Sequence, residues 1–184
     1  MKKNICFAVA DRLRMLLFCD KTHLKINFDG TETCDEASLK EQAEVFEGGE
    51  LTLLDIVPLC SSGHFCTRAG GIWDLVERSS DPKMEKTAIK EGINCPSGRL
   101  VLIDKKTGKE IEPDLVPSII AVEDTIKKVS GPLCVKGRIS IESADGKQYE
   151  LRNRVTLCRC GRSDNKPFCD STHTGIDFHL EEKR

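Results

Sequence analysis

The sequence predicts an α+β protein built from small units, in which a β-rich carboxy-terminal domain follows a β-α-α-β unit. Three observations support this prediction. The chain of 184 residues is 39% hydrophobic and 32% charged, which is lean for one large core. Turn signals separate several short β-rich runs after residue 117. Ten cysteines offer a source of stability other than apolar packing, because they can bind metal, form disulfides or pack as small apolar groups.

Changes in composition divide the chain into three expected units, residues 1–47, 48–104 and 105–184. The first unit is short of core residues and ends in a helical pattern from Ser38 to Phe46. The pair Gly48-Gly49 then interrupts the chain, so we place the start of the second unit there.

The second unit carries the β-α-α-β pattern. An apolar run at 51–57 predicts a buried strand, and helical patterns at 72–77 and 84–90 lead to a second strand at 99–103. Residues 105–117 contain a turn sequence and prolines, which is typical of a connector. Beyond it, the segments expected to form an antiparallel sheet are 118–123, 132–142 and 148–157, with a turn at 144–146.

The last of these segments runs into Cys158, Cys160, Cys169 and His173, which have the spacing C-x-C-x8-C-x3-H. Three thiolates and one imidazole from a single segment can complete tetrahedral coordination at each metal of a small cluster. Gly161 permits a sharp turn after the second cysteine. Since Cys169 and His173 are four residues apart, one helical turn would place them on the same face.

The segment CRCGRSDNKPFCDSTH resembles the signature of the CDGSH iron–sulfur domain family, and the likeness extends over about residues 118–180. Besides the four ligands, the shared positions are Gly161, Ser163, Pro167, Phe168 and Asp170. The family usually has glycine where this chain has Ser171, which matters if that position needs a positive φ. The resemblance implies a [2Fe–2S] cluster, with Cys158 and Cys160 on the inner iron and Cys169 and His173 on the outer iron. It also implies a homodimer.

A structural zinc site is the main alternative for this motif, although cysteines one residue apart are unusual zinc ligands. Histidine ligation has a consequence of its own, because an imidazole must be neutral to bind metal. Acid is therefore expected to compete for His173 and to release the cluster faster near pH 5 than near pH 8. Arg159, Arg162 and Lys166 are expected to favour the reduced cluster through their positive charge, unless they belong to a solvated loop.

A second group consists of Cys60, Cys66 and Cys95-Pro96, spaced C-x5-C with a distant C-P. Bacterial ferredoxins use C-x2-C-x2-C with a remote C-P, and Gly63 stands here where the second cysteine would be. Residues 50–103 are similar to a divergent single-cluster ferredoxin-like family. The resemblance implies that Cys60, Cys66 and Cys95 hold a [3Fe–4S] cluster, or a [4Fe–4S] cluster with one open iron. The alternative is that they are ordinary buried thiols.

Other residues near these motifs give weaker signals. His64 is available as a fourth ligand, but a lone loop histidine is more often a surface residue. Trp73 is expected in the core. Cys34 and Cys134 are expected to pack as small apolar groups, and Cys6 indicates no role.

The amino terminus contains a degenerate copy of the carboxy-terminal motif. Cys19-Asp-Lys-Thr-His23 repeats the pattern of Cys169 to His173, but Ala8 and Ala10 occupy the positions of the two partner cysteines. If the codons for Phe7 to Phe18 are regrouped by one frame, they permit Cys-Arg-Cys-Gly. We therefore hypothesise a pair of compensating frameshifts, which the gene sequence would test.

The formal net charge of −2 and the absence of a basic stripe argue against a nucleic-acid partner. Without a secretion signal or a long apolar run, a cytoplasmic protein with no membrane partner is expected. No nucleophile–base pair or phosphate loop is present, so an enzyme is not expected. The expected function is electron transfer to a redox partner, or transfer of a cluster to an apo-protein. The alternatives are a zinc-binding interaction module and an enzyme with an open iron in its middle cluster.

Overall fold

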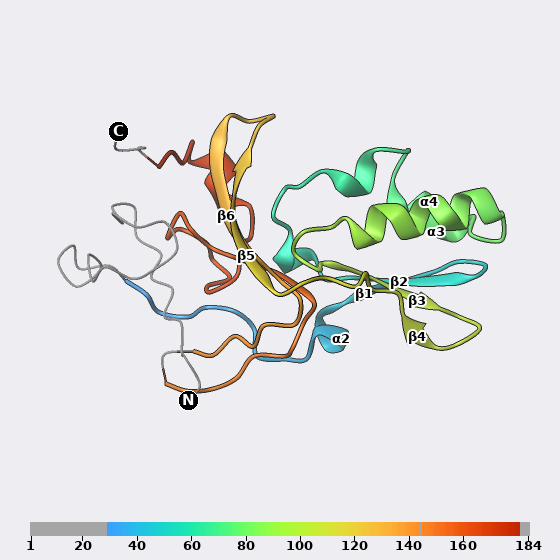
Figure 1. The fold of residues 1–184 in the computed structure, drawn as a ribbon, viewed down its shortest axis with the longest axis horizontal. Helices are drawn as coiled ribbons and strands as arrows, with labels where there is room; N and C mark the ends of the chain where they lie inside the picture. The colour runs from blue at the N-terminus through green and yellow to red at the C-terminus, as the bar shows by residue number, and fades with distance from the viewer. Residues whose placement is uncertain (1–28, 144, 181–184) are drawn as a thin grey trace.

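The computed structural model describes residues 29–143 and 145–180, which form an α+β fold with two antiparallel sheets, as predicted (Figure 1). The first sheet has the order β1 (Glu44–Glu47), β2 (Leu51–Asp55), β3 (Leu100–Asp104), β4 (Lys109–Glu110), and the second the order β5 (Ser118–Asp124), β6 (Val129–Lys136), β7 (Arg154–Leu157). The helices are α2 (Leu39–Gln42), α3 (Ile72–Glu77), α4 (Pro82–Ile93) and α5 (Thr172–Gly175), with 3-10 turns η1 (Val57–Leu59) and η2 (Phe65–Thr67). Within these described ranges, no helix has the length and apolar character needed to cross a membrane.

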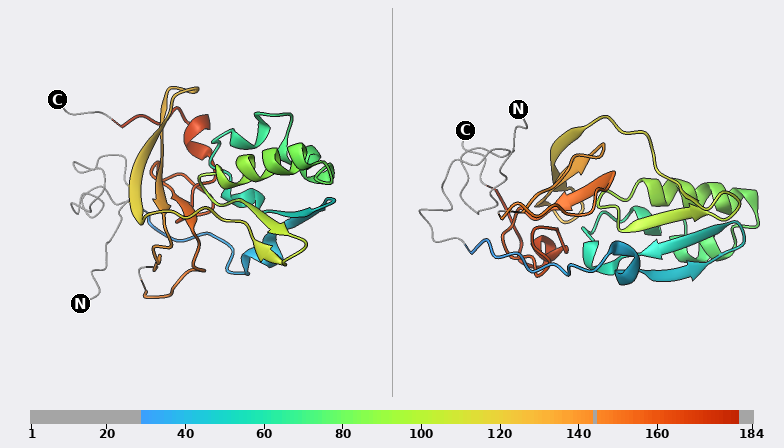
Figure 2. Two further views of the ribbon diagram at one scale, coloured as in Figure 1. Left: turned by 45° about the vertical axis from the view of Figure 1, so that its right-hand side comes forward. Right: turned by 90° about the horizontal axis from the view of Figure 1, so that it is seen from below.

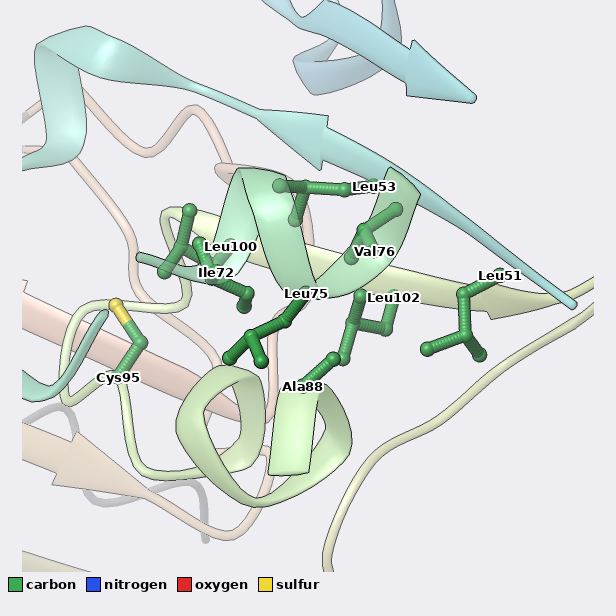
Figure 3. Close-up of a cluster of buried hydrophobic side chains, with 9 residues drawn as sticks. All are labelled: Leu51, Leu53, Ile72, Leu75, Val76, Ala88, Cys95, Leu100 and Leu102. Atoms are coloured by element: carbon green, nitrogen blue, oxygen red, sulfur yellow. The ribbon is translucent and has the colours of Figure 1, made fainter. Parts of the chain in front are cut away.

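The first core lies between the first sheet and the pair α3 and α4, which lie side by side on one face of that sheet (Figure 1 and Figure 2). Helix α4 begins where Asp81 accepts a hydrogen bond from the backbone N–H of Lys83, with Pro82 at the first helical position. Figure 3 shows this core, whose buried members are Leu51, Leu53, Ile72, Leu75, Val76, Ala88, Cys95, Leu100 and Leu102.

The second core joins the two sheets. Ile56 and Leu59, which follow β2, are 0% and 3% exposed and pack against residues of β6 and β7. The apolar partners from the second sheet and its following loop are Leu133, Val135, Val155, Leu157 and Phe168. Because the middle and carboxy-terminal parts bury apolar area against each other, they form one packed structure.

The helix predicted from Ser38 to Phe46 is wrong beyond Gln42. Ser38 and Glu41 form a capping box that starts α2, but the chain then extends into β1, which pairs with β2 from Glu44 to Glu47. Backbone pairing with the neighbouring strand therefore overrides the helical pattern.

Two further segments differ from the predicted elements. The connector expected at 105–117 contains β4, which pairs with the end of β3 after a turn. In the segment 148–157, only Arg154–Leu157 forms a strand, and Gln148 makes an isolated bridge to Glu142. The degenerate motif and Cys6 lie outside the described residues.

Candidate metal centres

The carboxy-terminal motif is a loop that returns alongside the strand from which it leaves. Cys158 follows β7 directly, and its N–H donates to Pro167 O at 2.9 Å. The N–H of Cys169 donates to Thr156 O, also at 2.9 Å, so the third cysteine lies beside the end of the same strand. Gly161 has φ of 72°, which provides the sharp turn predicted after Cys160.

Hydrogen bonds inside and outside the loop fix its shape. The buried Ser163 hydroxyl donates to Phe168 O at 2.7 Å and accepts from the N–H of Asn165 at 3.0 Å. From the amino-terminal side, the N–H groups of Thr33 and Cys34 donate to the carbonyl of Lys166, at 2.9 and 3.0 Å. The loop is thus ordered by its own chain and by a distant segment.

The four donor side chains fall into two close pairs. The sulfur atoms of Cys158 and Cys160 are 3.6 Å apart, and Cys169 Sγ is 3.4 Å from His173 Nδ1. A tetrahedral metal with bonds of about 2.3 Å to sulfur and about 2.0 Å to nitrogen separates two such donors by roughly 3.5–3.8 Å. Each pair therefore has a spacing that suits chelation of one metal, and the donor set fits a group with two metals.

Across residues 29–143 and 145–180, no three or more Cys, His, Asp or Glu side chains converge on one point in a way that could hold a single metal ion. None of the described cysteines forms a disulfide.

The backbone conformation between Cys169 and His173 differs from the prediction. Helix α5 begins at Thr172, so Cys169 precedes it and the two ligands do not share a helical turn. The left-handed backbone at Ser171, with φ of 72°, redirects the chain and still brings the two donors together. Asp170 accepts from the N–H groups of Thr172 at 3.0 Å and Asp164 at 2.8 Å. The departure from the family pattern at Ser171 therefore falls where glycine is favoured.

The charges of these groups depend on burial and on backbone N–H groups. The pKa of Cys158 is lowered to about 6, first by a hydrogen bond from the Cys160 thiol and then by backbone N–H groups of the loop. Burial raises the pKa of Cys169 and lowers that of His173. The imidazole is thereby favoured in the neutral form that a metal binds, and metal binding would release the remaining thiol protons.

The basic residues of the loop are placed differently from one another. Arg159 is 5% exposed, and its guanidinium donates to Val122 O at 3.0 Å and to a carboxylate oxygen of Glu123 at 2.6 Å. Arg162 is exposed and Lys166 is half-buried. The charge of Arg159 is therefore partly neutralised by Glu123.

The three cysteines of the middle region come together from separate elements. Cys60 follows η1, Cys66 lies in η2 and Cys95 follows α4. All three line one open pocket with about 290 Å³ of empty space. The fold thus places three thiols, up to 35 positions apart in the sequence (Cys60 to Cys95), along the wall of one pocket, and three thiols are a donor set that suits an iron–sulfur cluster.

The rest of the pocket wall supplies polar and charged groups. His64 is exposed at the pocket edge, and its Nε2 atom lies 3.0 Å from the Ser62 hydroxyl. Burial, and then the neighbouring Cys95, raise the pKa of Cys66, while Arg99, which also lines the pocket, opposes this shift. A cation in the wall is therefore available to stabilise thiolate charge.

Sequence reasoning missed the residues that join the two centres. Arg154 in β7 is 3% exposed and donates to the carbonyls of Gly92 and Cys95, both at 2.7 Å. The Asn165 amide donates to the carbonyl of Pro58, within η1, at 2.9 Å. In the sequence, the signal that could have identified Arg154 was a charged residue at the start of an apolar strand.

The remaining described cysteines pack as predicted. Cys134 is 2% exposed in β6, and Cys34 packs against the second core with its sulfur 3.8 Å from the Tyr149 hydroxyl. Trp73 packs against the first core, and its indole N–H donates to Asp55 at 3.0 Å.

Comparison with known families agrees with this division. Residues 130–174 match the family described as iron-binding zinc finger CDGSH type, and residues 46–105 match the family described as divergent 4Fe-4S mono-cluster. No curated protein and no solved structure gave a significant match to the chain. The two segments are therefore similar to two families whose members bind iron–sulfur clusters, the CDGSH type after the divergent mono-cluster type.

Proposed function

We propose that this protein binds two iron–sulfur centres and is not itself an enzyme. It transfers single electrons to a redox partner, or it transfers a cluster to an apo-protein. In this proposal Cys158 and Cys160 hold one iron of a [2Fe–2S] cluster, and Cys169 and His173 hold the other. Such a cluster supplies one-electron chemistry when it is bound. The observation that carries the proposal is the division of the four donors into two pairs, at 3.6 and 3.4 Å.

For the middle region we propose a ferredoxin-like unit in which β2 and β3 flank α3 and α4 along the chain. Cys60, Cys66 and Cys95 hold its cluster, as a [4Fe–4S] cluster with an open iron or as a [3Fe–4S] cluster. Their convergence on one pocket supports this assignment. The hydrogen bond from Asn165 to Pro58 supports a role in which the two centres exchange electrons, because it holds the two ligand loops against each other.

In this proposal, the carboxy-terminal loop stabilises the charge on the sulfur ligands and limits their contact with water. The N–H of Ser171 donates to Cys169 Sγ at 3.5 Å, and loop N–H groups lower the pKa of Cys158. These donors stabilise negative charge on the sulfur ligands. The buried Phe178 and the half-buried Leu180 pack against Cys158 and Cys160, which limits the access of water to those two sulfurs.

Metal and sulfide analysis of anaerobically purified protein tests the proposal. The wild type is expected to contain iron and acid-labile sulfide in near-equal amounts, with magnetic resonance signals from two cluster types. Cys160→Ser should remove only the [2Fe–2S] signal and Cys66→Ser only the other. The matched control Cys134→Ala should retain both, because Cys134, in β6, belongs to neither ligand set. Colourless protein containing zinc would instead favour the interaction module.

A further inference from the structure

A buried ion pair stands at the wall of the middle pocket. Arg99 Nε is 2.5 Å from Asp55 Oδ1, and its Nη2 is 2.8 Å from Asp55 Oδ2, so the contact is bidentate. The two side chains are 15% and 2% exposed. The Trp73 indole N–H donates to the same carboxylate at 3.0 Å. The guanidinium is therefore held in one orientation by contacts that the planar fork of arginine makes and lysine cannot reproduce.

The strands of the first sheet produce this arrangement. Asp55 ends β2 and faces Leu100 across the β2–β3 ladder, while Arg99 precedes β3. The carbonyl of Arg99 accepts from the N–H of Ile56 at 3.0 Å, which fixes its backbone as well. Strand register thus sets the position of the Arg99 guanidinium relative to Cys95, which is four residues earlier in the chain.

Arg99, the cation of this ion pair, is the member that lines the pocket beside the cysteines. Arg99 lines the pocket together with Cys60, Cys66 and Cys95, whereas Asp55 does not line it. Of the two charged groups, the cation is therefore the one that borders the same pocket as the sulfur atoms.

We propose that Arg99, held by Asp55 and Trp73, is a positioning residue that sets the reduction potential of the middle cluster. This inference rests on the proposed function of the middle cysteines. Reduction adds one negative charge to a cluster, so a fixed cation in a poorly solvated wall favours the reduced form. Removing the cation makes the middle cluster harder to reduce and leaves the carboxy-terminal cluster unaffected.

A redox titration of the complete protein, followed by magnetic resonance, tests this assignment with an internal standard. Arg99→Met is expected to shift the reduction equilibrium of the middle cluster about tenfold toward the oxidised form, which is about 59 mV for a one-electron couple. The carboxy-terminal cluster in the same molecule should keep its potential. Arg78→Met, which removes an exposed arginine paired with Asp74, is the matched control and should change neither.

If Arg99→Met does not fold because Asp55 has lost its partner, two milder variants test the same inference. Arg99→Lys keeps the charge but loses the bidentate contact, and Trp73→Phe removes one donor to Asp55. Both should shift the middle potential in the same direction by less than tenfold. Unchanged potentials in the folded variants, or equal shifts at both centres, would overturn the inference. A wild type that lacks the middle cluster would overturn the proposed function, and this inference with it.

Discussion

The two candidate centres are built in opposite ways. In the carboxy-terminal centre, one segment supplies every donor, and the loop between Cys158 and His173 closes on itself through backbone hydrogen bonds. In the middle centre, Cys60, Cys66 and Cys95 come from three elements and meet only in the folded protein. Local chain geometry therefore pre-forms the first centre, whereas the second depends on the packing of the whole sheet and its helices.

The sources of positive potential also differ. Backbone N–H groups of the loop, including that of Ser171, point at the carboxy-terminal sulfurs, and the nearby Arg159 is directed to Glu123. The middle pocket instead has a side-chain cation, Arg99. Single substitutions should therefore alter the charge around the middle centre more easily than around the carboxy-terminal one, because backbone donors survive a change of side chain.

The largest effect is expected where the two regions are joined. Arg154→Met would leave the Glu112 carboxylate and the carbonyls of Gly92 and Cys95 without their buried donor. We expect a loss of about 3–5 kcal/mol in the free energy of unfolding, measured by urea titration. The exposed control Arg78→Met should cost under about 1 kcal/mol. Equal losses in the two variants would mean that Arg154 does not couple the regions.

A smaller effect should distinguish the ligands of the carboxy-terminal centre. Acid competes for His173 because only the neutral imidazole binds metal, so visible absorbance of the wild type should decay faster near pH 5 than near pH 8. His173→Cys should slow the acid decay about tenfold, since the thiolate is a stronger soft ligand. The absorbance of the middle centre should not respond to this substitution. A wild type that decays at one rate at both pH values would contradict the prediction.

The smallest effect concerns the backbone between two ligands. Ser171 has φ of 72°, where a side chain costs about 1–2 kcal/mol and glycine does not. After allowing for the greater freedom of glycine in the unfolded chain, Ser171→Gly should stabilise the protein by about 0.5–1 kcal/mol. Ser140→Gly, at an exposed serine without a positive φ, is the matched control and should not stabilise. Thermal unfolding of both variants measures the difference.

Sequence reasoning succeeded best where the signal was local. The structure places Cys158 beside Cys160 and Cys169 beside His173, and Gly161 correctly marked the turn, although Cys169 and His173 do not share the expected helical turn. It failed where a neighbouring strand decided the outcome. The helical pattern up to Phe46 gave way to β1 because the edge of β2 was available for pairing.

By itself, the sequence determined the α+β class, the loop that carries the carboxy-terminal donors and the cysteines available to the middle centre. Only the tertiary structure decided that Cys60, Cys66 and Cys95 meet in one pocket, that Arg99 faces them, and that Arg154 joins the two regions. The physical reason is the range of the interactions. Motif spacing fixes contacts between residues close along the chain, whereas strand register and core packing fix contacts between residues that are distant in sequence.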